Sequence, residues 1–233
     1  MPPGEPGPVP NLENPGMTEN VARLRWAYES LLSEFGPQGW WPGGDSFEIM
    51  VGAVLTQNAA WRNAERAIGQ MRERGALTPA AVAALPLDRL EKLVRSAGGW
   101  RRKARTLAAL AETIESEKGG LAGLLSTDAG LLRQALLAIR GIGPETADAM
   151  LLYAAGHAVF VVDAYTRRFV ERHGIADARA GYAEVQELFE NALKHDAEAF
   201  AECHALLVEL GKRFCRPDPV CGECPLRKDL PGV

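Results

Sequence analysis

Apolar side chains recur every three or four residues along most of the chain, and charged or polar side chains fill the positions between them. This spacing is typical of amphipathic α-helices, which bury one face and expose the other to water. It predicts helices over residues 19–35, 46–73, 79–85, 87–97, 101–117, 129–139, 144–155, 163–173, 181–194 and 197–213. Only residues 158–162 have the composition of a strand, and so short a run favours a buried extended connector over a sheet. The predicted fold class is therefore all-α.

Chain length and composition indicate the class of protein and its cell compartment. The chain has 233 residues, of which 47% are hydrophobic and 24% charged, the balance of an ordinary globular protein. No apolar run reaches the roughly 18 residues that would suggest a membrane span. Residues 1–18 are rich in Pro and Gly and lack the features of a signal peptide, so we expect a disordered leader. We expect a monomeric cytoplasmic protein without a membrane partner.

Charge leaves the class of partner open. The net charge of −4 gives no gross basic surface, which argues weakly against a nucleic-acid partner. Basic residues do gather locally, within residues 101–105, 167–172 and 212–216. Each of these clusters is by default a solvated helix face.

Residues 139–149 carry a motif between two predicted helices. Gly141 and Gly143 flank Ile142, and two glycines so placed permit a tight hairpin whose backbone N–H groups point outward. Pro144 then stands where a first helical residue is expected, and its missing N–H costs nothing there. Exposed N–H groups at the positive end of a helix dipole suit a phosphate oxygen. An ordinary corner between two helices explains the same residues equally well.

Asp163 ends the apolar run 158–162 and begins a predicted helix rich in arginine. A carboxylate at such a place is commonly an N-cap, which accepts hydrogen bonds from the first N–H groups of its own helix. A carboxylate beside apolar residues at a cleft can also be a catalytic group. The residues themselves leave both roles open.

Together, the hairpin 141–147 and the pair Val162-Asp163 resemble the helix-hairpin-helix and following aspartate of the endonuclease III superfamily of DNA glycosylases. Three further stretches fall in the register of that family: 47–58, 98–104 with an aromatic residue before Lys-Ala, and 203–204 with the cysteine-rich tail. The resemblance spans roughly residues 20–228 in order. It implies a two-lobed helical DNA glycosylase fold and a cytoplasmic protein associated with the nucleoid.

The resemblance also implies roles for single residues. Asp163 corresponds to the aspartate that stabilises the sugar cation while the base leaves, and a carboxylate suits such an oxocarbenium-like state. The damaged nucleotide first leaves the base stack. The implied DNA-binding residues are Gln57, Asn58, Gly141, Ile142, Gly143, Thr146 and Arg167. Gln57 and Asn58 are candidates to fill the vacated space, with capping of their own helix as the alternative.

One departure from the family pattern concerns strand cleavage. Members that also cut the DNA strand carry a lysine two residues after the second glycine of the hairpin, where this chain has Glu145. A carboxylate cannot form the imine that this reaction needs. We therefore predict a monofunctional glycosylase with little or no lyase activity. The adenine-excising branch is also disfavoured, because Gly52 and Ala53 stand about where that branch places a catalytic glutamate.

Trp40 and Trp41, together with the missing lysine, make the chain similar to the bacterial 3-methyladenine glycosylases of this superfamily. An alkylated purine is cationic and would stack on an aromatic face. Trp40 and Trp41 are the favoured base-pocket residues, although most large aromatic side chains belong to the core. The predicted partner is duplex DNA that contains a damaged base. Two alternatives stay open, a bifunctional endonuclease III-type enzyme for oxidised pyrimidines and a non-catalytic protein that binds damaged DNA.

The tail after residue 214 carries three of the four cysteines, Cys215, Cys221 and Cys224. The resemblance implies a [4Fe-4S] cluster here, but Leu230 stands at the place of the fourth cysteine. A Cys-x2-Cys pair in a cytoplasmic protein favours a metal over a disulfide. Three alternatives stay open: a non-cysteine fourth ligand such as Asp229, a three-iron cluster, or a loop that has lost its metal. Cys203 is interpreted as a core thiol, and the four histidines as surface or core residues without metal-ligand spacing.

The predicted organisation has three parts. Residues 1–18 form the leader, 19–214 the helical glycosylase domain and 215–233 the cysteine-rich tail. The helix-hairpin-helix is expected at about residues 134–155, and the interface between the two lobes between about residues 36 and 163.

Overall fold

The computed structural model describes residues 15–41 and 44–231. Every regular element in these ranges is a helix, which confirms the predicted all-α class. The α-helices are α1 (Pro15–Phe35), α2 (Ser46–Leu55), α3 (Trp61–Glu73), α4 (Pro79–Ala84), α5 (Leu87–Leu93), α6 (Trp100–Ser116), α7 (Gly120–Leu125), α8 (Ala129–Ala138), α9 (Pro144–Tyr153), α10 (Ala164–Arg172), α11 (Tyr182–Ala192) and α12 (Ala197–Arg213). The 3-10 helices are η1 (Arg95–Ala97), η2 (Cys221–Glu223) and η3 (Arg227–Asp229). No helix in the described ranges has the length and apolar character needed to cross a membrane.

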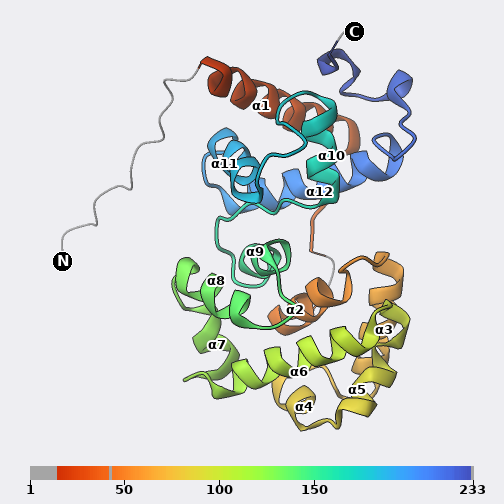
Figure 1. Cartoon of the computed structure of the whole chain (residues 1–233), viewed down its shortest axis with the longest axis vertical. Coiled ribbons are helices and arrows are strands. Elements are labelled where there is room, and N and C mark those ends of the chain that lie inside the picture. The colour runs from red at the N-terminus through yellow and green to blue at the C-terminus, as the bar shows by residue number, and fades with distance from the viewer. Residues whose placement is uncertain (1–14, 42–43, 232–233) are drawn as a thin grey trace, which may run out of the picture. The chain divides into compact units, whose positions relative to one another are not determined.

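The described chain divides into two compact units, whose helices are labelled in Figure 1. One unit contains both ends of the described chain, the residues up to Gln38 and those from Val162 onward. The other is formed by the continuous segment Gly39–Val161.

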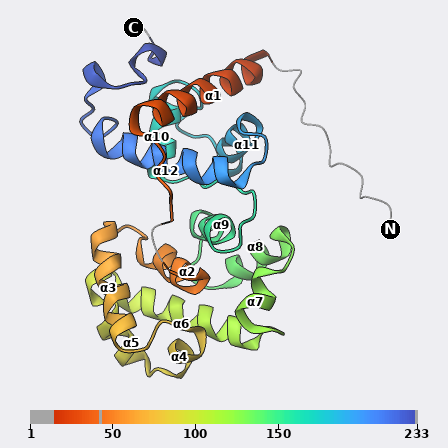
Figure 2. The ribbon, with the colours of Figure 1, turned by 180° about the vertical axis from the view of Figure 1, so that it is seen from behind.

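In the unit that holds both chain ends, α1 packs against α11 and α12, and α10 packs against α12 (Figure 2). Leu24, Ala27 and Leu31 of α1 are almost fully buried at helical spacing. Tyr165 of α10 lies directly on Gly211 of α12, where a Cβ would overlap the tyrosine ring. Glycine at this position therefore lets the first turn of α10 approach α12 closely.

In the unit Gly39–Val161, α6 is the central helix, because α2, α4, α5 and α7 all pack against it. Its buried apolar residues follow the helical period and point into the core: Ala104, Leu107, Leu110, Ala111 and Ile114. α2 also packs on α3 and α9, and α8 packs on α9. The packing of α2 on α6 and α9 thus supports the two elements that the sequence singles out, the end of α2 and the hairpin before α9.

The helices of the structure depart from the predicted ones mainly at α2 and α7. The single helix expected over 46–73 is wrong, because α2 ends at Leu55 and α3 starts at Trp61. Thr56 closes α2 through a hydrogen bond from its hydroxyl to Gly52 O at 2.9 Å, and Asn58 has a left-handed φ of 48°. α7 was not expected, because its two glycines weaken the helical pattern.

Two further predictions concern the leader and the apolar run 158–162. Most of the expected leader, residues 1–14, lies outside the described residues, and α1 already begins at Pro15. The apolar run 158–162 forms no strand, and its residues Phe160, Val161 and Val162 are buried.

Candidate functional site

A hairpin over residues 139–143 joins α8 and α9. Ile139 and Ile142 are each 6% exposed, so the turn packs inward through its apolar side chains. Gly141 has a φ of 99°, in the region that favours glycine. A Cβ at this residue would also overlap the hydroxyl of Thr106 on α6. Two independent constraints therefore require glycine at position 141.

An ion pair joins the two helices on either side of the hairpin. Arg133 of α8 donates to both carboxylate oxygens of Asp148 on α9, from Nε to Oδ1 at 2.6 Å and from Nη2 to Oδ2 at 3.1 Å. Asp148 is fully buried, so this bidentate contact satisfies a charge that would otherwise be costly in the interior. The contact fixes the two helices relative to each other.

The hairpin presents free backbone N–H groups. Within the described part of the chain, the N–H groups of Gly141 and Gly143 donate to no protein acceptor. Gly143 is the N-cap of α9, and Pro144 has no N–H of its own. The positive end of the α9 dipole adds to the charge on these groups. The arrangement can bind an anionic oxygen, such as that of a phosphate.

Gln57 connects the end of α2 to this hairpin. Its Nε2 donates to Gly141 O at 2.9 Å and to the Thr146 hydroxyl at 2.9 Å. Thr56, not Gln57, is the C-cap of α2, so the alternative of helix capping does not describe Gln57. Asn58 is exposed beside it. Three predicted DNA-binding residues, Gln57, Gly141 and Thr146, are thus brought together.

Trp41 is the centre of an aromatic cluster in the same unit. Its ring centroid lies 5.5 Å from that of Trp61, 5.2 Å from that of Tyr153 and 6.1 Å from that of Trp40. A Cβ at Gly52 would come within 3.0 Å of the Trp41 indole, so the glycine makes room for this ring on α2. The cluster joins both predicted base-pocket residues, Trp40 and Trp41, to Trp61 and Tyr153.

Asp163 is the N-cap of α10 in the other unit. Its Oδ1 accepts a hydrogen bond from the Thr166 N–H at 2.7 Å. Its Oδ2 lies 3.6 Å from Nε2 of His204 on α12, an ion pair when the imidazole is protonated. The side chain is 13% exposed. The capping role is therefore present in the structure, and the second carboxylate oxygen lies beside a buried histidine.

The pKa of Asp163 lies below its ordinary value. Burial by itself raises the pKa, but attraction to His204 and the hydrogen bond from the Thr166 N–H outweigh burial. The group is therefore a carboxylate at neutral pH. The sequence does not single out His204 as the neighbour of Asp163, because 41 positions separate the two residues; the Cys203-His204 pair in family register is the signal that points to it.

The arginines of α10 bond backbone carbonyls. Arg167 donates to Ala180 O at 3.1 Å, and Arg168 to Cys215 O at 2.6 Å. Arg172 donates to Arg216 O at 2.6 Å and to Pro217 O at 2.9 Å. The interpretation of this cluster as a solvated face is incomplete, since the arginines fasten loops. A DNA contact by Arg167 stays a prediction.

Comparison with known sequences decides the family. Residues 51–195 match the HhH-GPD superfamily of base excision DNA repair proteins, and this span contains the second half of α2, the hairpin and Asp163. The chain belongs to the HhH-GPD superfamily. The resemblance to endonuclease III inferred from the motifs is thereby confirmed, and the chain is by family a DNA repair glycosylase.

Relatives of this HhH-GPD protein match over most of its length. A Methanocaldococcus jannaschii protein, provisionally named as a DNA repair glycosylase, is 41% identical over 215 residues, covering 91% of this chain and 98% of that protein. Endonuclease III of Sulfolobus acidocaldarius is 29% identical over 183 residues, an alignment that covers 78% of this chain and 79% of that protein. The H. pylori 3-methyladenine DNA glycosylase bound to 1,N6-ethenoadenine has a TM-score of 0.73 at 28% identity, covering 83% and 97%. A DNA complex of endonuclease III has a TM-score of 0.78 at 22% identity, covers 91% and 95%, and shows the same fold.

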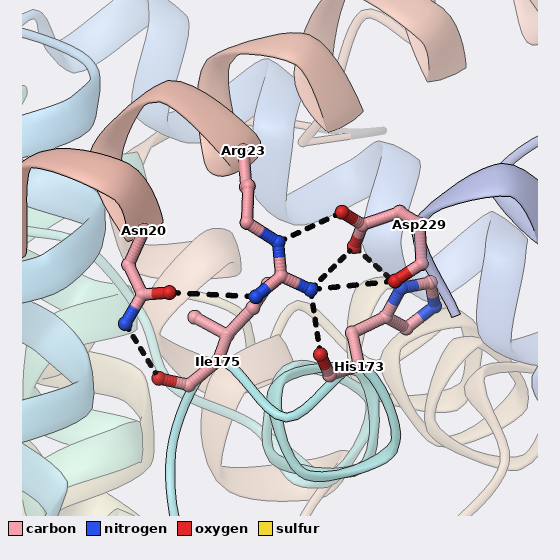
Figure 3. Close-up of polar contacts among 5 residues, drawn as sticks. All are labelled: Asn20, Arg23, His173, Ile175 and Asp229. Carbon is pink, nitrogen blue, oxygen red and sulfur yellow. Dashed lines mark hydrogen bonds and ion pairs between the residues drawn. The ribbon is translucent and has the colours of Figure 1, made fainter. Parts of the chain in front are cut away.

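The tail of this HhH-GPD protein offers no fourth ligand for the iron–sulfur cluster that the resemblance to endonuclease III implies, because Leu230 stands at the place of the fourth cysteine. Asp229, considered above as a fourth ligand, is held by other side chains (Figure 3). Arg23 of α1 bonds both of its carboxylate oxygens, from Nε to Oδ1 at 2.8 Å and from Nη2 to Oδ2 at 3.0 Å. His173 Nδ1 lies 2.7 Å from the same Oδ2. With both oxygens engaged, this carboxylate is not placed as a metal ligand.

The three tail cysteines do not form a complete ligand set either. Within residues 15–41 and 44–231, no group of three or more Cys, His, Asp or Glu side chains is placed to hold a metal ion. Cys215 is 8% exposed, and its Sγ accepts from Arg172 at 3.4 Å. Leu226 is fully buried in the tail. Protein contacts therefore hold the described part of this segment.

Proposed function

We propose that the protein is a monofunctional DNA glycosylase that releases an alkylated purine from duplex DNA. Two observations support the substrate class. The aromatic cluster around Trp41 offers faces on which a cationic purine can stack. The H. pylori relative, which is similar over most of the chain, is named as a 3-methyladenine glycosylase. A panel of duplexes that each carry one lesion tests this choice; release of oxidised pyrimidines alone would contradict it.

In this proposal the unit Gly39–Val161, which contains the hairpin, holds the DNA backbone. The free N–H groups of Gly141 and Gly143 receive a phosphate oxygen at the N-terminus of α9. Gln57 keeps the hairpin in shape through Gly141 and Thr146, and Asn58 is exposed for contact with the bases. Arg167 is the further cation assigned to DNA. Because phosphate contacts are electrostatic, binding should weaken as salt is added.

The observation that carries the catalytic proposal is the position of Asp163, whose Oδ1 caps α10 while its Oδ2 lies beside His204. During excision the bond from C1′ of the sugar to the base nitrogen breaks, and its electron pair leaves with the base. A cationic alkylpurine departs as a neutral molecule, and positive charge develops on the sugar. The Asp163 carboxylate stabilises that charge. Water then adds to C1′ and releases a proton.

Asp163→Asn tests this role directly. Asparagine also caps helices, so the variant should fold, yet it lacks the charge. We expect release of 3-methyladenine from methylated DNA to fall by about 100-fold or more in single-turnover assays. The matched control is Asp196→Asn, which replaces the N-cap of α12 and should leave the rate unchanged. Equal rates in Asp163→Asn and wild type would remove Asp163 from the mechanism. Binding of damaged DNA without release by the wild type would favour the non-catalytic alternative.

Glu145 supports the monofunctional assignment, because it is exposed in the first turn of α9 where bifunctional members carry the lysine. We expect borohydride to trap no covalent adduct between the protein and abasic DNA, since a carboxylate forms no imine. Glu145→Lys supplies an amine at this position and should gain trapping. A strong adduct with the wild-type protein would instead support the bifunctional endonuclease III-type alternative.

Two further parts of the proposal concern the cysteine-rich tail and the cell compartment. The tail is proposed to work without a [4Fe-4S] cluster, since Asp229 is engaged by Arg23 and His173. A substrate of chromosomal DNA would place the protein at the nucleoid, in the cytoplasm.

A further inference from the structure

We propose that Lys103 and Thr106 of α6 are positioning residues for the DNA-contacting surface. They fix the end of α2 and the hairpin 139–143 to the central helix α6, so that both elements meet DNA in a set register. The inference rests on the proposed function, because it assigns a role to residues that support the proposed DNA contacts. Neither side chain is proposed to touch DNA itself; both act by holding the residues that do.

Lys103 is a buried lysine whose ammonium bonds two carbonyl oxygens. It is 1% exposed, and its Nζ donates to Leu55 O at 2.9 Å and to Ala97 O at 2.8 Å. Leu55 is the last residue of α2 and Ala97 the last of η1. The negative end of the α2 dipole favours a cation at this place.

The bond to Leu55 replaces one that α2 gives up. In a continuing helix the N–H of Ala59 would donate to Leu55 O. Here it donates to Thr56 O at 3.0 Å instead, because the chain leaves the helix after Leu55. Without another donor the carbonyl would be buried and unsatisfied, which is costly. Lys103 supplies that donor, and so permits α2 to end where Gln57 can reach the hairpin.

Thr106 holds the hairpin from the same face of α6, one turn further on. Its hydroxyl lies 3.1 Å from Arg140 O and 3.2 Å from Arg102 O, and it packs under Gly141, where a Cβ would overlap it. It is 2% exposed. The hairpin therefore sits on Thr106 through both a polar contact and close packing.

These contacts close a ring. Lys103 holds the end of α2, Gln57 two residues later holds Gly141, and the preceding residue Arg140 is held by Thr106 on the helix where the ring began. A ring of this kind resists a relative shift of its parts more than separate contacts do, because each link limits the others. The free N–H groups of Gly141 and Gly143 and the exposed Asn58 are carried on it.

The first test compares variants of α6 in wild-type background. Thr106→Val removes the hydroxyl and keeps the shape, whereas Thr106→Ser keeps the hydroxyl. Loss of one hydrogen bond should raise the Kd for duplex DNA by about 2- to 10-fold in Thr106→Val, and Thr106→Ser should restore most of the affinity. The control Thr113→Val removes a hydroxyl on the same helix that bonds only Ala109 O, and should leave the Kd unchanged. A lower melting temperature with an unchanged Kd in Thr106→Val would overturn the proposal.

The second test asks whether the contacts form one ring. Gln57→Ala opens the ring at another point, so adding Thr106→Val or Lys103→Met to it should weaken DNA binding less than either does alone. Fully additive losses would show independent contacts and contradict the proposal. Failure of the proposed function is distinguishable, because in that case the wild-type protein itself neither binds methylated duplex DNA nor releases a base from it.

Discussion

Lys103 keeps an amino group in the protein interior, and its ionisation should be visible in stability. Burial, aided by the nearby charge of Arg102, lowers the pKa of Lys103 from 10.5 to about 8. In the unfolded chain the group keeps its ordinary pKa. Between the two values the unfolded chain binds a proton that the folded chain does not. The free energy of unfolding must then rise with pH over this window, from about pH 8 to about pH 10.5.

We predict that this rise is on the order of 3 kcal/mol in wild type and absent in Lys103→Met. Urea unfolding at several pH values measures it. Tyrosines and exposed lysines titrate in both proteins alike, so the difference between the two curves isolates Lys103. Parallel curves from pH 7 to pH 10 would show that Lys103 keeps its proton.

Residues with a local signature could be found from the sequence, and residues with a distant partner could not. Asp163 follows an apolar run and starts a helix, and Gly141 belongs to a compact motif. The neighbour of Asp163, His204, lies on another helix far along the chain, and apart from the family register of the Cys203-His204 pair the sequence does not indicate the contact. Thr106 was not singled out at all, although it explains why a glycine is needed at residue 141.

At the level of elements, the hairpin sets different demands on its two glycines. Gly141 combines a positive φ with the close approach of Thr106, so Gly141→Ala introduces strain and a steric clash. Gly143 has a φ of −103° and open space around its Cα, so Gly143→Ala meets neither problem.

We predict that Gly141→Ala lowers the free energy of unfolding by about 1–3 kcal/mol, and that Gly143→Ala changes it by less than about 0.5 kcal/mol. Denaturant unfolding of the two variants beside wild type is the measurement. If Gly141→Ala lowers the free energy of unfolding no more than Gly143→Ala does, the hairpin tolerates a side chain at 141 and Thr106 moves aside.

Most helices could be predicted because each carries an apolar face with the helical period. The end of α2 could not, since the polar run Thr56-Gln57-Asn58 is short and Ala59 and Ala60, which favour helix, follow it directly. There a tertiary network decides: Lys103 takes the last carbonyl of α2, and Gln57 turns to the hairpin. α7 was missed for the opposite reason, since a helix with two glycines in six residues depends on its packing against α6.

At the level of the whole molecule, the two ends of the described chain are fastened to each other. Arg23 of α1 holds the carboxylate of Asp229, and it also donates to His173 O at 2.6 Å (Figure 3). Burial lowers the pKa of His173, although Asp229 opposes this, so the ring is neutral at pH 7 and its Nδ1 serves as a donor to the carboxylate. Asn20 adds a bond to Ile175 O at 3.0 Å. The tail is thereby tied to α1 and to the end of α10 through side chains.

This arrangement predicts that the tail depends on Asp229 and not on iron. Asp229→Asn should lower the free energy of unfolding by about 1–3 kcal/mol, because Arg23 loses a charged bidentate partner in a largely buried site. Asp218→Asn, an exposed tail carboxylate, is the matched control and should have no effect. Treatment of wild type with an iron chelator should leave the melting temperature unchanged. A brown protein that contains about four irons per chain and melts earlier after chelation would contradict the prediction, because a cluster would then supply the stability here attributed to Arg23 and His173.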